Sequence, residues 1–312
     1  MNKFIKVCLS IVGVLMAFGL VLFVIGAMFG GINQVEDITR RGGFNYTFSN
    51  GNFHVAAADW NFDDYDYDEY YDDFEEYKEY EFDDLGDVAD INEVKIEVGA
   101  CKLDVLEYDG ATYKVEVENV YHLKCFVEEG VLNIGGERDT FPNIGERRVT
   151  LYVPKGAKLD NLDISLGAGV GEIEAIEAQE IDIEVGAGEL TGVDLTAEES
   201  DISVGAGSVS LRGCEFGDVK FEVGVGSASY KGVLTGDAKV DCGMGNVSMK
   251  LDGEREDFNY RLECAMGEID IDGKEYSGLG NSKREDNDAV NTMDLDCSMG
   301  HISVKFNEEI VE

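Results

Sequence analysis

Glycines, cysteines and carboxylates are the residue types in this sequence whose spacing offers chemistry. Segments such as Gly186-x-Gly188-x-x-x-Gly192 are similar to the glycine-rich turns that hold dinucleotide phosphates. This motif, however, recurs along the chain, no helical pattern follows it, and its spacing differs from Gly-x-Gly-x-x-Gly. We therefore interpret these glycines as structural corners and predict no cofactor-binding residue.

The residue types that usually catalyse reactions or bind metals do not occur at the spacings that known catalytic or metal-binding motifs require. The three histidines, His54, His122 and His301, have no metal-ligand spacing to one another or to a cysteine. Neither Gly-x-Ser-x-Gly nor Gly-x4-Gly-Lys-Ser/Thr occurs. The 65 acidic residues alternate along expected strands, so no glycosidase pair stands out. We predict no catalytic residue, no metal site and no enzyme activity.

Cys242, Cys264 and Cys297 occupy one column of a repeat in which other copies carry Val or Leu. We predict a core cysteine column of small buried hydrophobic side chains. Since stacked strands lie about 4.8 Å apart, a disulfide and a soft-metal site stay open as alternatives.

A 19-residue repeat positions all these residues. Apolar and polar residues alternate on both sides of a Gly-x-Gly turn, which is typical of strands with one buried face. We predict an all-β fold, a parallel β-solenoid over residues 161–306 with one coil per repeat. We expect positive φ at its corner glycines. These are Gly167, Gly169, Gly186, Gly188, Gly205, Gly207, Gly224, Gly226, Gly243 and Gly245, with looser copies at Gly267 and Gly300.

Less regular segments flank these repeats. Residues 91–160 are strand-like and are predicted to form a β-rich cap. Residues 273–288 are expected to form a polar loop, and 307–312 an acidic tail. In the last three copies methionine takes the middle of the turn, at Met244, Met266 and Met299. We expect an aligned row, for which corner packing is favoured over a soft binding strip.

The N-terminal segment predicts membrane attachment. Residues 7–32 carry no charge, and about 20 apolar residues suffice to span a bilayer. Lys3 and Lys6 favour a cytoplasmic N-terminus at residues 1–6. We therefore expect a single-pass protein of the cell membrane that contacts lipid through residues 7–32, with its C-terminal domain extracellular. Gly26-x-x-x-Gly30 allows weak self-association.

Residues 33–90 have a different composition. Between Asp59 and Asp87, fifteen of 29 residues are acidic and ten are aromatic. Charges at this density repel one another, so we predict a disordered acidic aromatic linker. The formal net charge of −40 excludes nucleic acid as a partner, because binding it requires a basic surface.

Together these segments resemble a known family. Val149-Thr-Leu-Tyr-Val-Pro-Lys-Gly156, Leu159-Asp-Asn-Leu-Asp-Ile-Ser-Leu-Gly-Ala-Gly169 and the repeated Val-Gly-Ala-Gly are similar to the bacterial "putative adhesin" β-strand repeat family, also called the toastrack domain. The resemblance covers residues 91 to about 306. The acidic linker and the methionine-containing turns depart from the family pattern.

The resemblance implies an envelope role, and it places the chain among proteins with an N-terminal membrane segment that are common in Gram-positive bacteria. It carries over no catalytic residue. Our leading hypothesis is a non-catalytic, membrane-anchored scaffold or sensor ectodomain that contacts another envelope protein. The alternative is a surface adhesin that binds a glycan or a host or wall surface, and the third is a β-helix carbohydrate-active enzyme.

Overall fold

The computed structural model describes residues 44–49, 52–57, 79–82, 85, 90–120, 123–135, 146–277 and 280–307. The predicted membrane span 7–32, with Gly26 and Gly30, lies outside these residues. By its backbone contacts the chain divides at residue 42, and the described residues belong to the second unit. Within the described segments, no helix has the length and apolarity that crossing a membrane requires.

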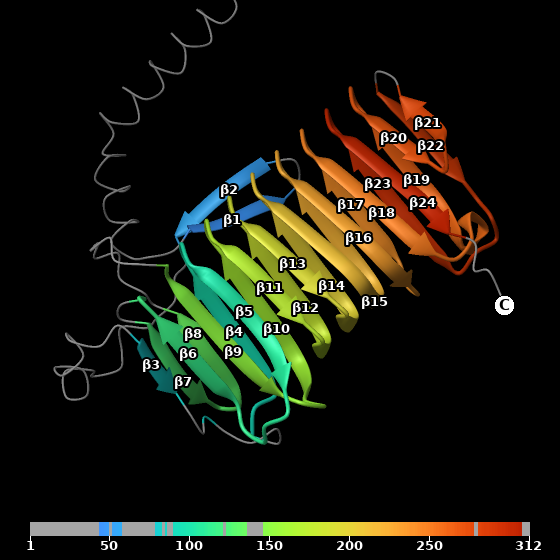
Figure 1. The fold of residues 1–312 in the computed structure, drawn as a ribbon. Helices are drawn as coiled ribbons and strands as arrows, with labels where there is room; N and C mark the ends of the chain where they lie inside the picture. Colours follow the sequence, from blue (N-terminus) through green and yellow to red (C-terminus); the bar gives the residue numbers. More distant parts are fainter. Residues whose placement is uncertain are drawn as a thin grey trace, which may run out of the picture. The chain divides into compact units, whose positions relative to one another are not determined.

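The fold is all-β, as the alternating sequence predicts (Figure 1). The first strands are β1 (Phe44–Ser49), β2 (Asn52–Ala57), β3 (Glu79–Phe82), β4 (Glu93–Val98), β5 (Lys102–Tyr108), β6 (Lys114–Glu118), β7 (Lys124–Glu128), β8 (Val131–Gly135) and β9 (Arg148–Pro154). The regular repeats form β10 (Lys158–Leu166), β11 (Val170–Glu174), β12 (Glu177–Val185), β13 (Glu189–Val193), β14 (Thr196–Val204), β15 (Ser208–Val223), β16 (Ser227–Leu234), β17 (Ala238–Cys242) and β18 (Asn246–Asp252). The last strands are β19 (Phe258–Cys264), β20 (Glu268–Ile271), β21 (Lys274–Ser277), β22 (Asn281–Glu285), β23 (Asn291–Cys297) and β24 (His301–Asn307).

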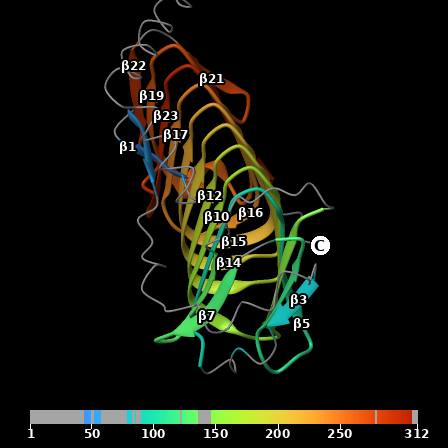
Figure 2. The same cartoon turned by 90° about the vertical axis from the view of Figure 1, so that its left-hand side faces the viewer.

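Each repeat forms one coil of two strands, and successive coils pair in parallel; the register is one full repeat except where β15 meets β16, where it shifts between Arg212 and Cys214. Ile164 pairs with Ile183, and Ile183 pairs with Ile202. Where the register is one full repeat, inward side chains stack on their equivalents in the next coil. Figure 2 shows the backbone coils lying one behind another. The sequence prediction of a parallel solenoid is therefore confirmed.

The coils at both ends are stacked out of sequence order. At the C-terminal end, β23 pairs with β17 on one side and β19 on the other, so the last coil of the chain inserts between two earlier ones. At the N-terminal end, β4 lies between β8 and β10. The expected cap region 91–160 thus contains two coils of the solenoid itself.

Antiparallel strands cover both ends of the stack. Strands β6 and β7 pair antiparallel with β9 and β8, and β21 and β22 pair antiparallel with β20 and β19. The expected polar loop at 273–288 therefore contains two strands. Charged residues within it, including Lys274, Lys283 and Glu285, tolerate the edge position, where no further coil stacks.

Three strands lie among the described residues of the segment 33–90, where the sequence predicts a disordered linker. Strands β1 and β2 form a two-stranded antiparallel sheet of their own, and β3 pairs with β6. The sequence of β3, Glu79-Tyr-Glu-Phe82, alternates between charge and aromatic ring, and the partly buried Phe82 packs against the core. This local alternation outweighs the high average charge.

The predicted inner columns form one continuous core. Leu166, Val185, Val204 and Val223 are at most 2% exposed. Tyr230 is also buried, and its hydroxyl donates to the carbonyls of Val233 and Cys214. The buried tyrosine hydroxyl thus meets the hydrogen-bonding requirement that burial imposes.

The corner glycines are required for a different reason from the one expected. None of them is among the described residues with positive φ. A Cβ on Gly207 would instead lie 2.1 Å from the carbonyl oxygen of Gly188, and one on Gly169 would lie 1.9 Å from that of Cys101. The second glycine of each turn is therefore fixed by the close approach of stacked coils. The first has slightly more room, and two coils replace it with Ala265 and Ser298.

Candidate binding surface

The predicted cysteine column is present and buried, but its spatial order differs from the sequence order. Cys297 lies between Cys242 and Cys264, because β23 inserts between β17 and β19. The described cysteines are all free thiols. A hydrogen bond from the Cys242 thiol lowers the pKa of Cys297 to about 7 and raises the pKa of Cys242. The three cysteine side chains are buried and stack in register in the core.

An open groove of about 400 Å³ lies on the outer face of one sheet. Strands β12, β14, β15, β17, β23 and β19 contribute its side chains, so it crosses the point where the chain order changes. Its lining residues are Glu180, Glu199, Ser200, Asp201, Asp218, Val219, Lys220, Asp237, Ala238, Lys239, Arg261, Thr292 and Asp294.

One side of the groove is a row of acids. Glu180, Glu199 and Asp218 stack in register on consecutive strands, and Asp237 continues the row. Asp218 accepts a hydrogen bond from the backbone nitrogen of Asp237 at 2.7 Å, and Asp237 accepts one from Thr292 at 2.7 Å. The two aspartates thereby link adjacent coils, while Glu180 and Glu199 are exposed. We call Glu180, Glu199, Asp218 and Asp237 the acidic row.

The other side of the groove carries charges of both signs. Lys220 contacts Asp201 and Glu222, each at 2.7 Å, and Lys239 contacts Asp241 at 3.1 Å. Although partial burial opposes its protonation, hydrogen bonds with Asp201 and Glu222 raise the pKa of Lys220. These two lysines are therefore held by acids of their own side, and Arg261 is the third cation that lines the groove.

Stacking of like charges extends beyond the groove. Burial, then the nearby carboxylates of Glu180, Asp163 and Asp201, raise the pKa of Asp182 to about 6. Burial followed by neighbouring acids also raises the pKa of Asp296. At Asp182 and Asp296 the repeat places acidic residues on adjacent strands about 4.8 Å apart, so the neighbouring charges disfavour ionisation of these two carboxyl groups. Such a face favours a cationic ligand, which would relieve this repulsion.

The groove contains no arrangement suited to covalent chemistry. Its described lining residues include no histidine, cysteine or aromatic side chain. Among the described parts of the chain, no three His, Cys, Asp or Glu side chains form a metal-binding group. A flat, rigid surface with fixed charges is suited to binding rather than to nucleophilic attack.

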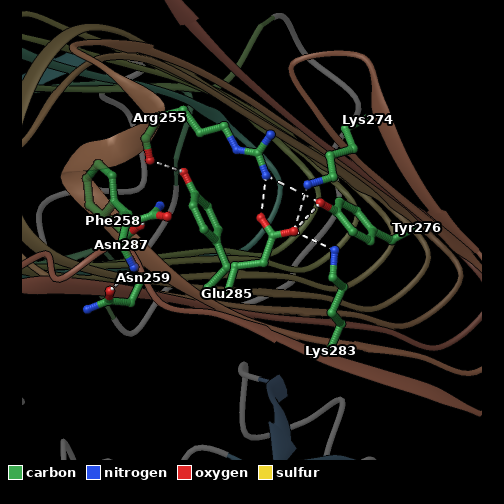
Figure 3. Close-up of polar contacts among 9 residues, drawn as sticks. Arg255, Phe258, Asn259, Lys274, Tyr276, Lys283, Glu285 and Asn287 are labelled. Atoms are coloured by element: carbon green, nitrogen blue, oxygen red, sulfur yellow. Dashed lines mark hydrogen bonds and ion pairs between the residues drawn. The ribbon is translucent and has the colours of Figure 1, made fainter.

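A second charged cluster lies on the C-terminal cap (Figure 3). Glu285 accepts hydrogen bonds from Lys274 at 2.7 Å, from the Tyr276 hydroxyl at 2.8 Å, and from Arg255 and Lys283. Partial burial opposes ionisation, but these hydrogen bonds and the Arg255 charge lower the pKa of Glu285 to about 2. Its cations are engaged with Glu285, so we assign this cluster to holding β21 and β22 in place.

Sequence reasoning found the outward direction of these side chains but missed the groove. The signal was present, since the acidic row recurs at the same 19-residue period as the glycines. Thr292 and Asp294 join the groove only because β23 inserts beside β17. Of the predicted histidines, His301 starts β24 and His54 lies on β2, while His122 lies outside the described residues.

Comparison with known proteins identifies the domain. Residues 91–305 match the sequence profile of the family described as Toastrack DUF4097. No curated protein matches the chain.

Solved structures resemble the chain at low identity. A "putative adhesin" from Bacteroides fragilis is 11% identical with a TM-score of 0.44, over 72% of this chain and 95% of its own. A "putative cell adhesion protein" from Clostridium sporogenes is 16% identical with a TM-score of 0.34, over 74% and 99%. A "putative lipid binding protein" from Parabacteroides distasonis is 13% identical with a TM-score of 0.40, over 73% and 96%.

Proposed function

Because this chain belongs to the Toastrack family, we propose that it is a non-catalytic, membrane-anchored envelope protein whose solenoid binds a cationic protein partner. The uncharged segment 7–32 supports attachment to the membrane, and the lysines before it support an extracellular solenoid. The role that fits is a scaffold or sensor ectodomain, consistent with the envelope function that the family resemblance implies.

The observation that carries this proposal is the acidic row in the groove. Four carboxylates stack at a fixed spacing on the sheet, Lys220 and Lys239 are paired with other acids, and the acidic side chains of the groove outnumber its cations even with Arg261 included. A basic segment that lies along the groove would place its cations near successive acids of the row. Complementary charge of this kind gives specificity and speeds association.

Glycan binding, the alternative adhesin function, is less well supported by the groove. Sugar rings commonly stack on aromatic faces, and the described lining residues provide none. The groove therefore favours a protein ligand over a sugar.

The test is capture of partners by the full-length protein from membranes of its own cells. Glu180→Gln with Glu199→Gln removes two exposed charges and leaves the backbone links of Asp218 and Asp237 intact. Glu174→Gln with Glu189→Gln removes the same charge from the other sheet and serves as the matched control. We expect loss of a salt-sensitive partner in the groove variant alone. Equal capture by both variants would refute the proposal.

A further inference from the structure

Three methionines form an exposed row at one corner of the solenoid. The backbone nitrogen of Met299 donates to the Gly243 carbonyl, and that of Met266 donates to the Ser298 carbonyl, each at 2.7 Å. Coil by coil, the spatial order is therefore Met244, Met299, Met266. Their exposed fractions are 57%, 51% and 64%.

Packing alone does not explain this row. Met249 and Met293 pack in the core of this protein, and both are fully buried, unlike the three methionines of the row. In the regular coils the same corner position is held by Ala168, Ala187, Ala206 and Val225, the last with 58% of its surface exposed. The corner therefore needs no long side chain, and the expectation of corner packing does not fit the exposed fractions.

The spacing of the row suits a single soft ion. Adjacent coils lie about 4.8 Å apart. Two sulfurs bound to one ion, each at about 2.3 Å, lie at most about 4.6 Å from each other. Methionine has three rotatable bonds, so three neighbouring thioethers can converge on one ion without moving the backbone.

An imidazole adjoins the row. His301 follows Met299 by two residues and lies in register between Asn246 and Glu268 on the neighbouring strands. Its side chain points outward, because the next residue, Ile302, is buried. A fourth ligand of intermediate softness thus lies two residues along the chain from the middle methionine, on the outer face of the same coil.

We propose that Met244, Met299, Met266 and His301 bind a soft monovalent cation of the Cu(I) class. Thioethers are neutral, soft ligands that select Cu(I) over hard cations such as Mg²⁺ or Ca²⁺. The chain's net charge of −40 raises the local concentration of any cation at its surface.

The test uses Ag(I) as a redox-inert probe of this class. The full-length protein is labelled with ¹³C at the methionine methyl groups, and Ag(I) is added up to one equivalent. We expect the methyl signals of the three row methionines to shift, while those of buried Met249 and Met293 stay in place. The unchanged buried signals also report that the fold is intact.

Variants taken from the chain's own coils sharpen the test. Met→Ala at all three positions reproduces the corner of the regular coils, and His301→Asn reproduces Asn246 of the adjacent coil. The triple variant should lose the stoichiometric site, and His301→Asn should weaken Ag(I) binding roughly tenfold. Replacing Ag(I) by Ca²⁺ should shift no methyl signal.

Two results would overturn the proposal. One is that the row methyl signals do not move with one equivalent of Ag(I). The other is that binding is unchanged in the triple variant but lost when Cys242, Cys264 and Cys297 are replaced by Val, which places the ion on the buried thiols. Valine fills the same column at Val185 and Val204, so this second variant is expected to fold.

Discussion

Replacing Gly207 by alanine tests the reason we give for the corner glycines. The new Cβ would lie 2.1 Å from the Gly188 carbonyl oxygen and 2.9 Å from its nitrogen. Both distances are well inside the 3.4 Å at which ordinary contact begins, and both neighbours are backbone atoms that cannot rotate away. The two coils must therefore separate at this corner.

The magnitude follows from what that separation disturbs. Overpacking against fixed atoms costs about 1–3 kcal/mol. The bond from the Ser208 nitrogen to the Gly188 carbonyl, 2.9 Å long, would also weaken, at about 1 kcal/mol. We expect Gly207→Ala to destabilise the domain by about 3 kcal/mol, which lowers the melting temperature by roughly 6–12 °C for a domain of this size.

The matched control is the first glycine of the same turn. A Cβ on Gly205 would lie 2.8 Å from the Gly186 carbonyl, and other coils accept Ala265 or Ser298 at this place. Gly205→Ala should therefore cost about 1 kcal/mol, the low end of the overpacking range. Thermal unfolding of both variants, followed by circular dichroism, measures the difference. Equal stability of the two variants would refute the close-approach argument.

Three further substitutions test the electrostatics and the core. The pKa of Asp182 is about 6 in the folded state and 3.8 in the unfolded state, so this carboxyl destabilises the fold increasingly as pH rises from about 4 to 6. Asp182→Asn should therefore raise the melting temperature at pH 7 and leave it unchanged below pH 4. Because the pKa of Glu285 is lowered to about 2, the stability that its carboxylate contributes is complete above pH 4.5 and is lost as pH falls toward 2. Glu285→Gln should lower the free energy of unfolding by about 2 kcal/mol at pH 7. In urea titrations near pH 2 the variant and the wild type should be equally stable. Tyr230→Phe removes the donor to two carbonyls in the core and should cost about 1–2 kcal/mol in the same titration, and a cost near zero would mean that water reaches these carbonyls.

The fold of the regular coils follows from sequence because its signals are local and periodic. The alternation around Ile181, Ile183 and Val185 defines the buried face, and the 19-residue period fixes the register of one coil on the next. Every repeat has the same alternation of apolar and polar residues, so the residues that stack in each inner column can be assigned from the sequence.

The order of the end coils could not be obtained in this way. Strand β23 carries the same alternation as β19, so either one satisfies the exposed edge of β17. The choice depends on β21 and β22, which fold back antiparallel to cover the end, and on the Glu285 cluster that holds them. These are long-range contacts that no local period records.

The glycine argument shows a second limit of sequence reasoning. A recurrent Gly-x-Gly suggests positive φ, yet the actual constraint is the distance between coils, which acts on Gly188 and Gly207 from a neighbour 19 residues away. The groove shows the same limit. The 19-residue period of its acidic row can be read from the sequence, but Thr292 and Asp294 line the groove only because of the position of β23.

The most direct test of the proposed binding function is site-specific photo-cross-linking in living cells. A photoreactive residue at Thr292, which lines the groove, is compared with one at Ser303 on the other sheet. The account predicts a discrete protein adduct at Thr292 that carries a basic contact segment, that disappears with Glu180→Gln and Glu199→Gln, and that is absent at Ser303. Equal adducts at both positions, or a Thr292 adduct that persists in the double variant, would contradict it.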